Sequence, residues 1–236
     1  MERNPEGIRA WCADERKRVL LLSATPRAQG NSQCLATAFA EGASQSNAQV
    51  RIVRLSEHIS GFLRDCRSCR MNDGECAIAD DHAWIFRELF LPADAIVYAS
   101  PIWWYGISAQ LKAFIDRMFC YVAQAYPDSG NVVEAISGKR AALLLSAEES
   151  NLSARLGITA QMSELCRYLR HDLVGVVTGI GNTRSEVSRD PADPLASART
   201  LGIRLFDTKA TDYRIDTDRP KSVWSAKPVE FPASWR

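Results

Sequence analysis

The sequence predicts a three-layer α/β fold in which a five-stranded parallel sheet has the strand order 2-1-3-4-5, followed by a long C-terminal tail. Two observations lead to this fold class. Short, mostly apolar runs of residues alternate with segments of helical spacing. Runs of this kind are typical of strands covered on both faces, and parallel strands need helical crossovers between them.

The five predicted strands end in polar or turn-forming residues. They occupy residues 19–22, 50–55, 95–99, 141–145 and 173–178. The second run contains Arg51 and Arg54, so we place it at a partly solvated edge of the sheet.

The predicted helices lie between and after these strands. Their expected N-terminal regions contain Asn31, Asp80, Ser108, residue 153 and Pro194. Asp193 and Pro194 form the pairing of N-cap and first-turn proline that starts many helices. Residues 60–79 are predicted to form a loop, and residues 119–139 a long connection.

The chain divides into an N-terminal extension (1–17), one domain (18–206) and a C-terminal extension (207–236). The first segment is charged and aperiodic, so we expect it to lie on the surface. The last contains Pro220, Pro228 and Pro232, which exclude a regular helix or central strand. Its four aromatic residues predict that it crosses to a second subunit near the ligand site, with docking on its own subunit as the alternative.

The composition excludes several classes of protein. Lys plus Arg is 29 and Asp plus Glu is 28, so neither nucleic-acid binding nor a strongly acidic electron carrier is expected. No apolar run is long enough for a membrane span. The N-terminus lacks an apolar signal core, and seven cysteines is an odd number, so we expect free thiols in the cytoplasm.

The loop after the first strand is a predicted phosphate site. Residues 23–32 join a strand to a helix, where free backbone N–H groups and the helix dipole attract anions. Thr25, Asn31 and Ser32 add polar donors, and Arg27 adds a positive charge. The loop has neither the GK[ST] nor the GxGxxG pattern. The alternative interpretation is a polar loop that only caps the helix.

The loop after the third strand is rich in aromatic residues. It reads Pro101, Ile102, Trp103, Trp104, Tyr105 and Gly106. Such a loop offers an apolar wall and backbone N–H groups to a planar ligand. The alternative interpretations are a dimer interface and a satellite hydrophobic core. Both loops fall where the strand order switches, which is where doubly wound folds bind mononucleotides.

These motifs, in this order, resemble the NADPH-dependent FMN reductase and iron–sulfur flavoprotein branch of the flavodoxin-like superfamily. The matching segments are residues 25–27 and 30–32, Cys66-x-x-Cys69 with Cys76, residues 100–103 and residues 110–117. The resemblance implies a flavodoxin-like fold, bound FMN, NAD(P)H as reductant and a homodimer or homotetramer.

The resemblance also assigns cofactor contacts. It implies that the FMN phosphate is held by Thr25, Arg27, Asn31 and Ser32. The ribityl chain and ring would be lined by Pro101, Ile102, Trp103, Trp104 and Gly106, and the other ring edge by Ala147, Glu148 and Ser150. The family often has glycine at the position of Ala24. The additional Cβ atom of Ala24 hinders a close approach of the backbone to the ligand.

The cysteines do not predict a metal site. A [4Fe–4S] cluster normally takes four thiolates, and Cys66, Cys69 and Cys76 supply three. A packed loop is favoured, and a regulatory pair of Cys66 and Cys69 stays open. The remaining cysteines are interpreted as isolated, and they are Cys12, Cys34, Cys120 and Cys166.

The predicted function is an FMN-dependent NAD(P)H oxidoreductase that reduces a flavin, quinone or similar small acceptor in a ping-pong sequence. The flavin N5 would carry the chemistry, so no catalytic side chain is predicted. His58 and His171 are interpreted as surface or cap residues, and Lys112 and Asp116 as an ion pair along a helix. The alternatives are a reductase or dehydrogenase of one metabolite, an electron-transfer flavoprotein and a flavin-binding regulatory module.

Overall fold

A computed structural model describes residues 5–71 and 73–208. Its five-stranded parallel sheet has the order β2-β1-β3-β4-β5, which confirms the predicted fold class. The strands are β1 (Arg18–Ser23), β2 (Gln49–Arg54), β3 (Ala95–Pro101), β4 (Arg140–Ala147) and β5 (Asp172–Ile180). Ser23 of β1 pairs in register with Ala99 of β3, so the carboxyl ends of these two strands lie side by side.

Helices connect the strands and cover both faces of the sheet. The helices are α1 (Pro5–Ala13), α2 (Asn31–Gln45), α3 (His82–Trp84), α4 (Ala109–Val122), α5 (Ser129–Ile136), α6 (Ser153–Leu169) and α7 (Pro194–Ile203). The shorter turns are η1 (Leu55–Glu57), η2 (Ser68–Arg70), the π-helical η3 (Ile85–Phe90) and η4 (Glu186–Arg189). Ser108 and Asp193 accept hydrogen bonds from the first turns of α4 and α7, as predicted for caps. No helix among the described residues has the length and apolar composition needed to cross a bilayer.

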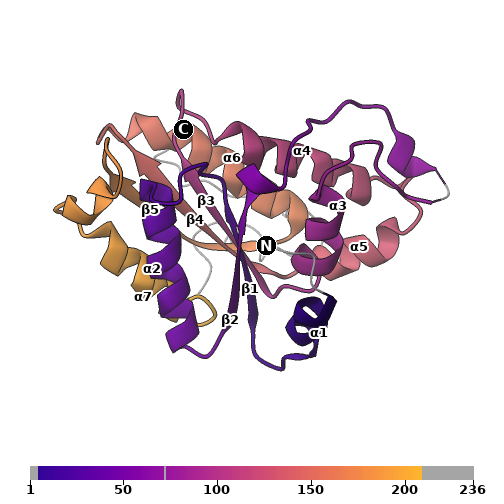
Figure 1. The fold of residues 1–236 in the computed structure, drawn as a ribbon, viewed down its shortest axis with the longest axis horizontal. Coiled ribbons are helices and arrows are strands. Elements are labelled where there is room, and N and C mark those ends of the chain that lie inside the picture. The colour runs from indigo at the N-terminus through magenta and orange to yellow at the C-terminus, as the bar shows by residue number, and fades with distance from the viewer. Residues whose placement is uncertain (1–4, 72, 209–236) are drawn as a thin grey trace, which may run out of the picture.

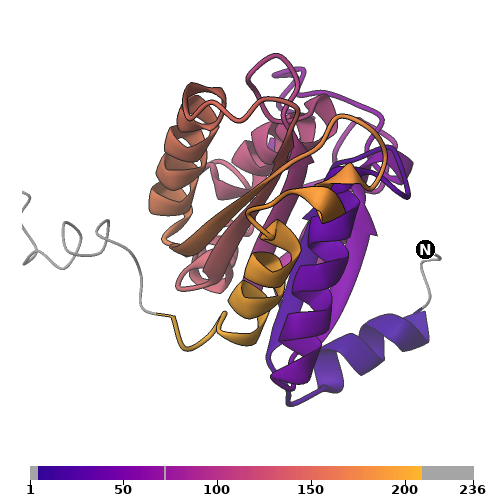
Figure 2. The ribbon, with the colours of Figure 1, turned by 90° about the vertical axis from the view of Figure 1, so that its left-hand side faces the viewer.

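The sheet separates two hydrophobic cores. Helices α2 and α7 pack on one face, where Val19 and Leu21 point from β1. Helices α4 and α6, together with η3 and the Trp11 side chain of α1, cover the other face around Leu20 and Leu22. Figure 1 shows the two groups of helices on opposite sides of the strands, and Figure 2 shows α2 and α7 lying side by side.

Two predicted irregular segments contain helices. Residues 5–13, within the predicted surface extension, form α1, and Trp11 is only 1% exposed. The Arg51 guanidinium lies 5.5 Å from the centre of the Trp11 ring and donates to the carbonyl of Gly7, which holds α1 against the edge strand. The connection 119–139 contains the end of α4 and the whole of α5, whose Val132 side chain is buried. The predicted tail lies almost wholly outside the described residues.

The contact between α2 and α7 depends on glycine. A Cβ atom at Gly42 would lie well inside contact distance of the backbone carbonyl oxygen of Arg199, and one at Gly202 would meet the carbonyl oxygen of Phe39. Backbone atoms cannot rotate away as a side chain can, so the two helices approach this closely only because both positions lack a side chain.

We expect Gly42→Ala to lower the free energy of unfolding by about 1–3 kcal/mol, since it forces α2 and α7 apart. Gly157→Ala in α6 is the matched control, because a Cβ there would meet nothing within 4 Å. The control should be neutral or stabilising by about 0.4–1 kcal/mol. Urea unfolding of both variants measures the difference, and equal stabilities would contradict this account of the interface.

Candidate functional site

The first part of the site is the loop between β1 and α2. Gly30 caps α2 without a side-chain hydrogen bond in the described structure, so the first-turn N–H groups are available to an anion. A Cβ at Gly30 would lie 2.7 Å from Thr25 Oγ1. The buried Thr25 hydroxyl accepts from the Arg27 N–H at 3.3 Å, and the Arg27 side chain is exposed. Ser32 Oγ lies 3.1 Å from Ser146 Oγ at the end of β4.

Asn31 has a structural role that the sequence does not reveal. Its amide nitrogen donates to the carbonyl oxygens of Gly181 at 2.8 Å and Thr183 at 3.0 Å. Its amide oxygen accepts from the N–H of Val187 at 3.2 Å. The side chain therefore fixes the loop after β5 against the start of α2, and its predicted phosphate contact stays a prediction.

The aromatic loop after β3 is a tight hairpin. Trp103 and Gly106 exchange backbone hydrogen bonds of 3.0 and 3.1 Å, and the two residues between them have positive φ angles, 51° at Trp104 and 60° at Tyr105. Such turns favour Asn or Gly, so two bulky aromatic residues here are costly. The cost and the 97% exposure of Trp104 indicate a surface that serves binding.

These two loops border one cleft at the carboxyl edge of the sheet. Its lining residues are Thr25, Arg27, Gly30, Asn31, Ser32, Pro101, Ile102, Trp103, Ser146, Ala147, Glu148, Gly181 and Asn182. Nine of the twelve predicted contact residues are thus brought together. Trp104 lines an adjoining groove instead, while Gly106 and Ser150 line neither space.

Three further polar or small residues line the cleft without being among the predicted contacts, and they are Ser146, Gly181 and Asn182. Ser146 is the last residue but one of β4, and Gly181 and Asn182 follow β5. Their position after parallel strands is the signal that could have found them, because all carboxyl ends of such strands share one edge.

The adjoining groove begins where the cleft ends. Ile102, Ala147 and Glu148 line both spaces, and the groove adds Trp104 and Tyr105. The Tyr105 hydroxyl lies 3.4 Å from the Glu149 carboxylate. The combined site therefore has a cationic, hydroxyl-rich part at Arg27 and an aromatic part bordered by carboxylates.

The histidines lie outside this site. His58 and His171 are buried, so their interpretation as surface residues is wrong. The alternative interpretation as a cap is right for His58, which is the C-cap residue of η1. His58 Nδ1 is 2.8 Å from Asp81, and His171 Nε2 is 2.8 Å from the Ile136 carbonyl. Burial lowers the pKa of His171 to about 4. The predicted ion pair of Lys112 and Asp116 is present at 2.5 Å.

A second, smaller pocket contains the cysteines. Cys66, Cys69 and Cys76 line it together with Cys120 from the end of α4. The interpretation of Cys120 as isolated is therefore wrong. The sequence separates Cys120 from Cys69 by the whole of β3 and most of α4, so no local pattern relates them.

A parallel sheet of this order, with a cleft at the carboxyl ends of β1 and β3 where the strand order switches, defines a doubly wound α/β protein. The chain belongs to the flavodoxin-like fold family, whose family model matches residues 17–187. This finding agrees with the resemblance inferred from the motifs.

Individual relatives extend the comparison. YwqN of Bacillus subtilis, whose name describes an NAD(P)H-dependent FMN-containing oxidoreductase, is 24% identical over 185 residues, which cover 78% of this chain and 96% of YwqN. An iron–sulfur flavoprotein of Archaeoglobus fulgidus is 33% identical over 97 residues, or 41% of this chain. The chain spans 43% of that relative's length and 51% of a similarly named Methanocaldococcus jannaschii protein. The solved structure of an NAD(P)H:quinone oxidoreductase from Methanothermobacter marburgensis matches this chain with a TM-score of 0.63 and 20% sequence identity. The match covers 81% of this chain and 96% of that protein, so the two share a fold.

The iron–sulfur relatives raise the question of whether a cluster fits the cysteine pocket. Its free volume is about 20 Å³, which is on the order of one water molecule. Within residues 5–71 and 73–208, no three Cys, His, Asp or Glu side chains are placed to hold one metal ion. The first of these observations bears on a four-iron cluster, because the pocket as it stands has no room for one.

Proposed function

We propose that this protein is an FMN-dependent NAD(P)H oxidoreductase that reduces a small acceptor such as a flavin or a quinone. The observation that carries the proposal is the joining of the anion-binding start of α2 and the aromatic hairpin after β3 in one cleft. The names of YwqN and of the Methanothermobacter marburgensis structure support the same chemistry.

The chain's own residues would divide the work of binding. Arg27 and the first-turn N–H groups of α2 bind the phosphate, with the Ser32 hydroxyl as a further donor. Pro101, Ile102 and Trp103 form the wall beside the flavin. When bound, FMN supplies the two-electron chemistry, and the protein positions it.

The groove beside the cleft and a second subunit would orient the acceptor and exclude water. The groove beside the cleft places Trp104 and Tyr105 next to Glu148, so a planar acceptor can stack there at the open end. Assembly into a homodimer or homotetramer is part of the same proposal. A second subunit would cover the Trp104 side chain, which a single chain leaves exposed.

The test is to mix purified protein, FMN and NADPH without air. We expect the absorbance of oxidised flavin to be lost rapidly after mixing. A quinone added afterwards should reoxidise the flavin and restore this absorbance. Flavin that binds but stays yellow with both NADPH and NADH would contradict a reductase and indicate an electron carrier or a binding module. A screen of quinones, flavins and azo dyes then identifies the acceptor class.

A further inference from the structure

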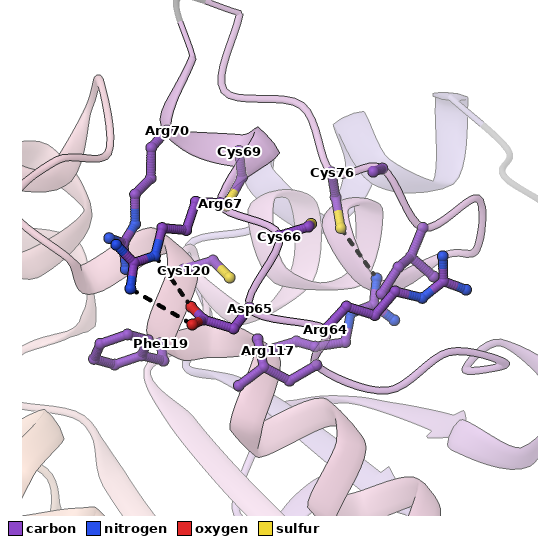
Figure 3. Close-up of a pocket in the computed structure, with 13 residues that line it drawn as sticks. Arg64, Asp65, Cys66, Arg67, Cys69, Arg70, Cys76, Arg117, Phe119 and Cys120 are labelled. Carbon is purple, nitrogen blue, oxygen red and sulfur yellow. Dashed lines mark hydrogen bonds and ion pairs between the residues drawn. The ribbon is translucent and has the colours of Figure 1, made fainter.

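The cysteine pocket is separate from the cleft. It is formed by the loop 60–79 and the end of α4, and none of its lining residues lines the cleft or the groove. Figure 3 shows Cys66, Cys69, Cys76 and Cys120 gathered around one small space with arginine side chains around it. The proposed flavin chemistry uses none of these thiols.

Cys66 and Cys69 differ in the way that a reacting pair of thiols requires. Cys66 is exposed, whereas Cys69, three residues along the chain, is 3% exposed. Arg67 between them has a φ of 61°, and this left-handed residue turns the chain so that both cysteines line the same pocket. A molecule from solution can therefore reach the Cys66 thiol, whereas the Cys69 thiol is buried.

The surroundings of Cys66 stabilise a thiolate. The Ser68 hydroxyl donates to Cys66 Sγ at 3.4 Å. Hydrogen bonds from Ser68, with a further contribution from the charge of Arg64, lower the pKa of the Cys66 thiol. The thiolate is the nucleophilic form of cysteine, so Cys66 is the reactive member of the pair.

The inner thiols have different partners. Burial and a hydrogen bond with Cys69 raise the pKa of Cys120 to about 12, so Cys120 stays protonated beside Cys69. Cys76 Sγ accepts a hydrogen bond from Arg117 at 3.7 Å. Cys69 is therefore the thiol placed to follow Cys66 in a reaction.

The charge of the pocket selects an anion. Four arginines and one carboxylate, Asp65, line it. Asp65 pairs with Arg67, and Arg117 pairs with Asp80 outside the lining. Arg64 and Arg70 form no ion pair within the described part of the chain, unlike the other two arginines of the pocket. The charge of Arg64 acts on Cys66, whereas the Arg70 guanidinium lies 5.9 Å from the centre of the Phe119 ring.

We propose that Cys66 and Cys69 form a thiol–disulfide exchange site for a small disulfide that carries carboxylates and that meets the exposed Cys66 thiol at the surface rather than entering the pocket. Cys66 Sγ attacks one sulfur of the small disulfide, so that a mixed disulfide forms and one thiol leaves. Cys69 Sγ then attacks Cys66 Sγ, forming the Cys66–Cys69 bond and releasing the second thiol. Two electrons and the two thiol protons pass from the protein to the two released small thiols.

The experiment uses the full chain as purified, reduced and freed of reductant, with glutathione disulfide as the probe. We expect loss of two of the seven thiols and a Cys66–Cys69 link in the peptide map. Cys69→Ser should instead accumulate one glutathione adduct at Cys66. The wild-type peptide map does not depend on any variant, so it decides the question even if a variant folds poorly.

Cys12 on α1 is the matched control, since it is also exposed but lies outside the pocket. Cys66 should react with glutathione disulfide about tenfold faster than Cys12 does. At low salt, Cys66 should also react faster with glutathione disulfide, which carries carboxylates, than with the cationic disulfide cystamine. Arg64→Ala should reduce that preference.

Two outcomes would overturn the proposal. One is a Cys66 that reacts no faster than Cys12, or a mixed disulfide that Cys69 does not resolve. The other is stoichiometric iron or zinc in anaerobically purified protein that Cys66→Ser removes, because the thiols would then be metal ligands. We expect less than about one iron per chain, against four for a [4Fe–4S] cluster.

Discussion

Replacing both Arg27 and Ser32 with alanine is expected to weaken FMN binding by about two to four orders of magnitude. Each side chain would donate a charge-assisted hydrogen bond to the phosphate, worth about 1.5–3 kcal/mol. Arg27 is exposed at the cleft and Ser32 lies in the first turn of α2, so both donors face the same end of the ligand. Isothermal titration with FMN measures the loss.

A control variant separates this effect from a general loss of stability. The control combines Arg204→Ala with Ser46→Ala and so removes the same two types of side chain. Arg204 caps the C-terminus of α7 and Ser46 that of α2, and neither residue lines the cleft. The control should bind FMN as the wild type does. Unchanged affinity in the Arg27 and Ser32 double variant would overturn the phosphate assignment. Because Ser32 also contacts Ser146, thermal melting of both proteins shows whether the cleft itself is intact.

The sheet is predictable from the sequence because its strands are buried on both faces. Every position from Val19 to Leu22 is fully buried, so the apolar run itself marks the strand. The cleft follows from the same information, since parallel strands place their following loops at one edge. Capping by Ser108 and Asp193 is likewise a local property of the chain.

Features made by distant contacts are not predictable in this way. Trp11 is buried because it packs into the core beside the sheet, with Arg51, 40 positions away, against its ring. The Asn31 amide donates to the carbonyl oxygen of Gly181, which is 150 positions away in the sequence. Cys120 joins the other thiols only when α4 packs against the loop 60–79. In each case the local sequence is compatible with several partners, and tertiary packing selects one.

The cysteine pocket and the cleft also depend on different parts of the fold. The cleft lies at the carboxyl ends of β1, β3 and β4. The pocket lies between the loop 60–79 and α4, and a buried ion pair of Arg117 with Asp80 links α4 to the residue that follows this loop. Arg117 donates to both oxygens of Asp80, at 2.6 and 2.8 Å, and to the Gly61 carbonyl at 3.2 Å. Both charged side chains are almost completely buried, at 2% and 3% exposure.

Burial alone would raise the pKa of the Asp80 carboxyl. The hydrogen bonds from Arg117 and from the backbone N–H groups of His82 and Ser60 outweigh it and lower the pKa from 3.8 to about 2. The folded-state pKa is thus below the ordinary value expected in the unfolded chain. The ion pair therefore contributes its full stability above about pH 4, and the contribution is lost as the pH falls towards 2.

Arg117→Ala is expected to lower the free energy of unfolding by about 3–5 kcal/mol at neutral pH, because it leaves the Asp80 charge buried without its partner. Lys112→Ala on the same helix is the matched control. It removes the exposed pair with Asp116 and should cost only about 0.3–0.5 kcal/mol. Urea unfolding from pH 7 to pH 2 should show the gap between wild type and Arg117→Ala narrowing as Asp80 becomes protonated. A loss no larger than that of the control, or a gap that does not change with pH, would show that the pair does not hold the loop.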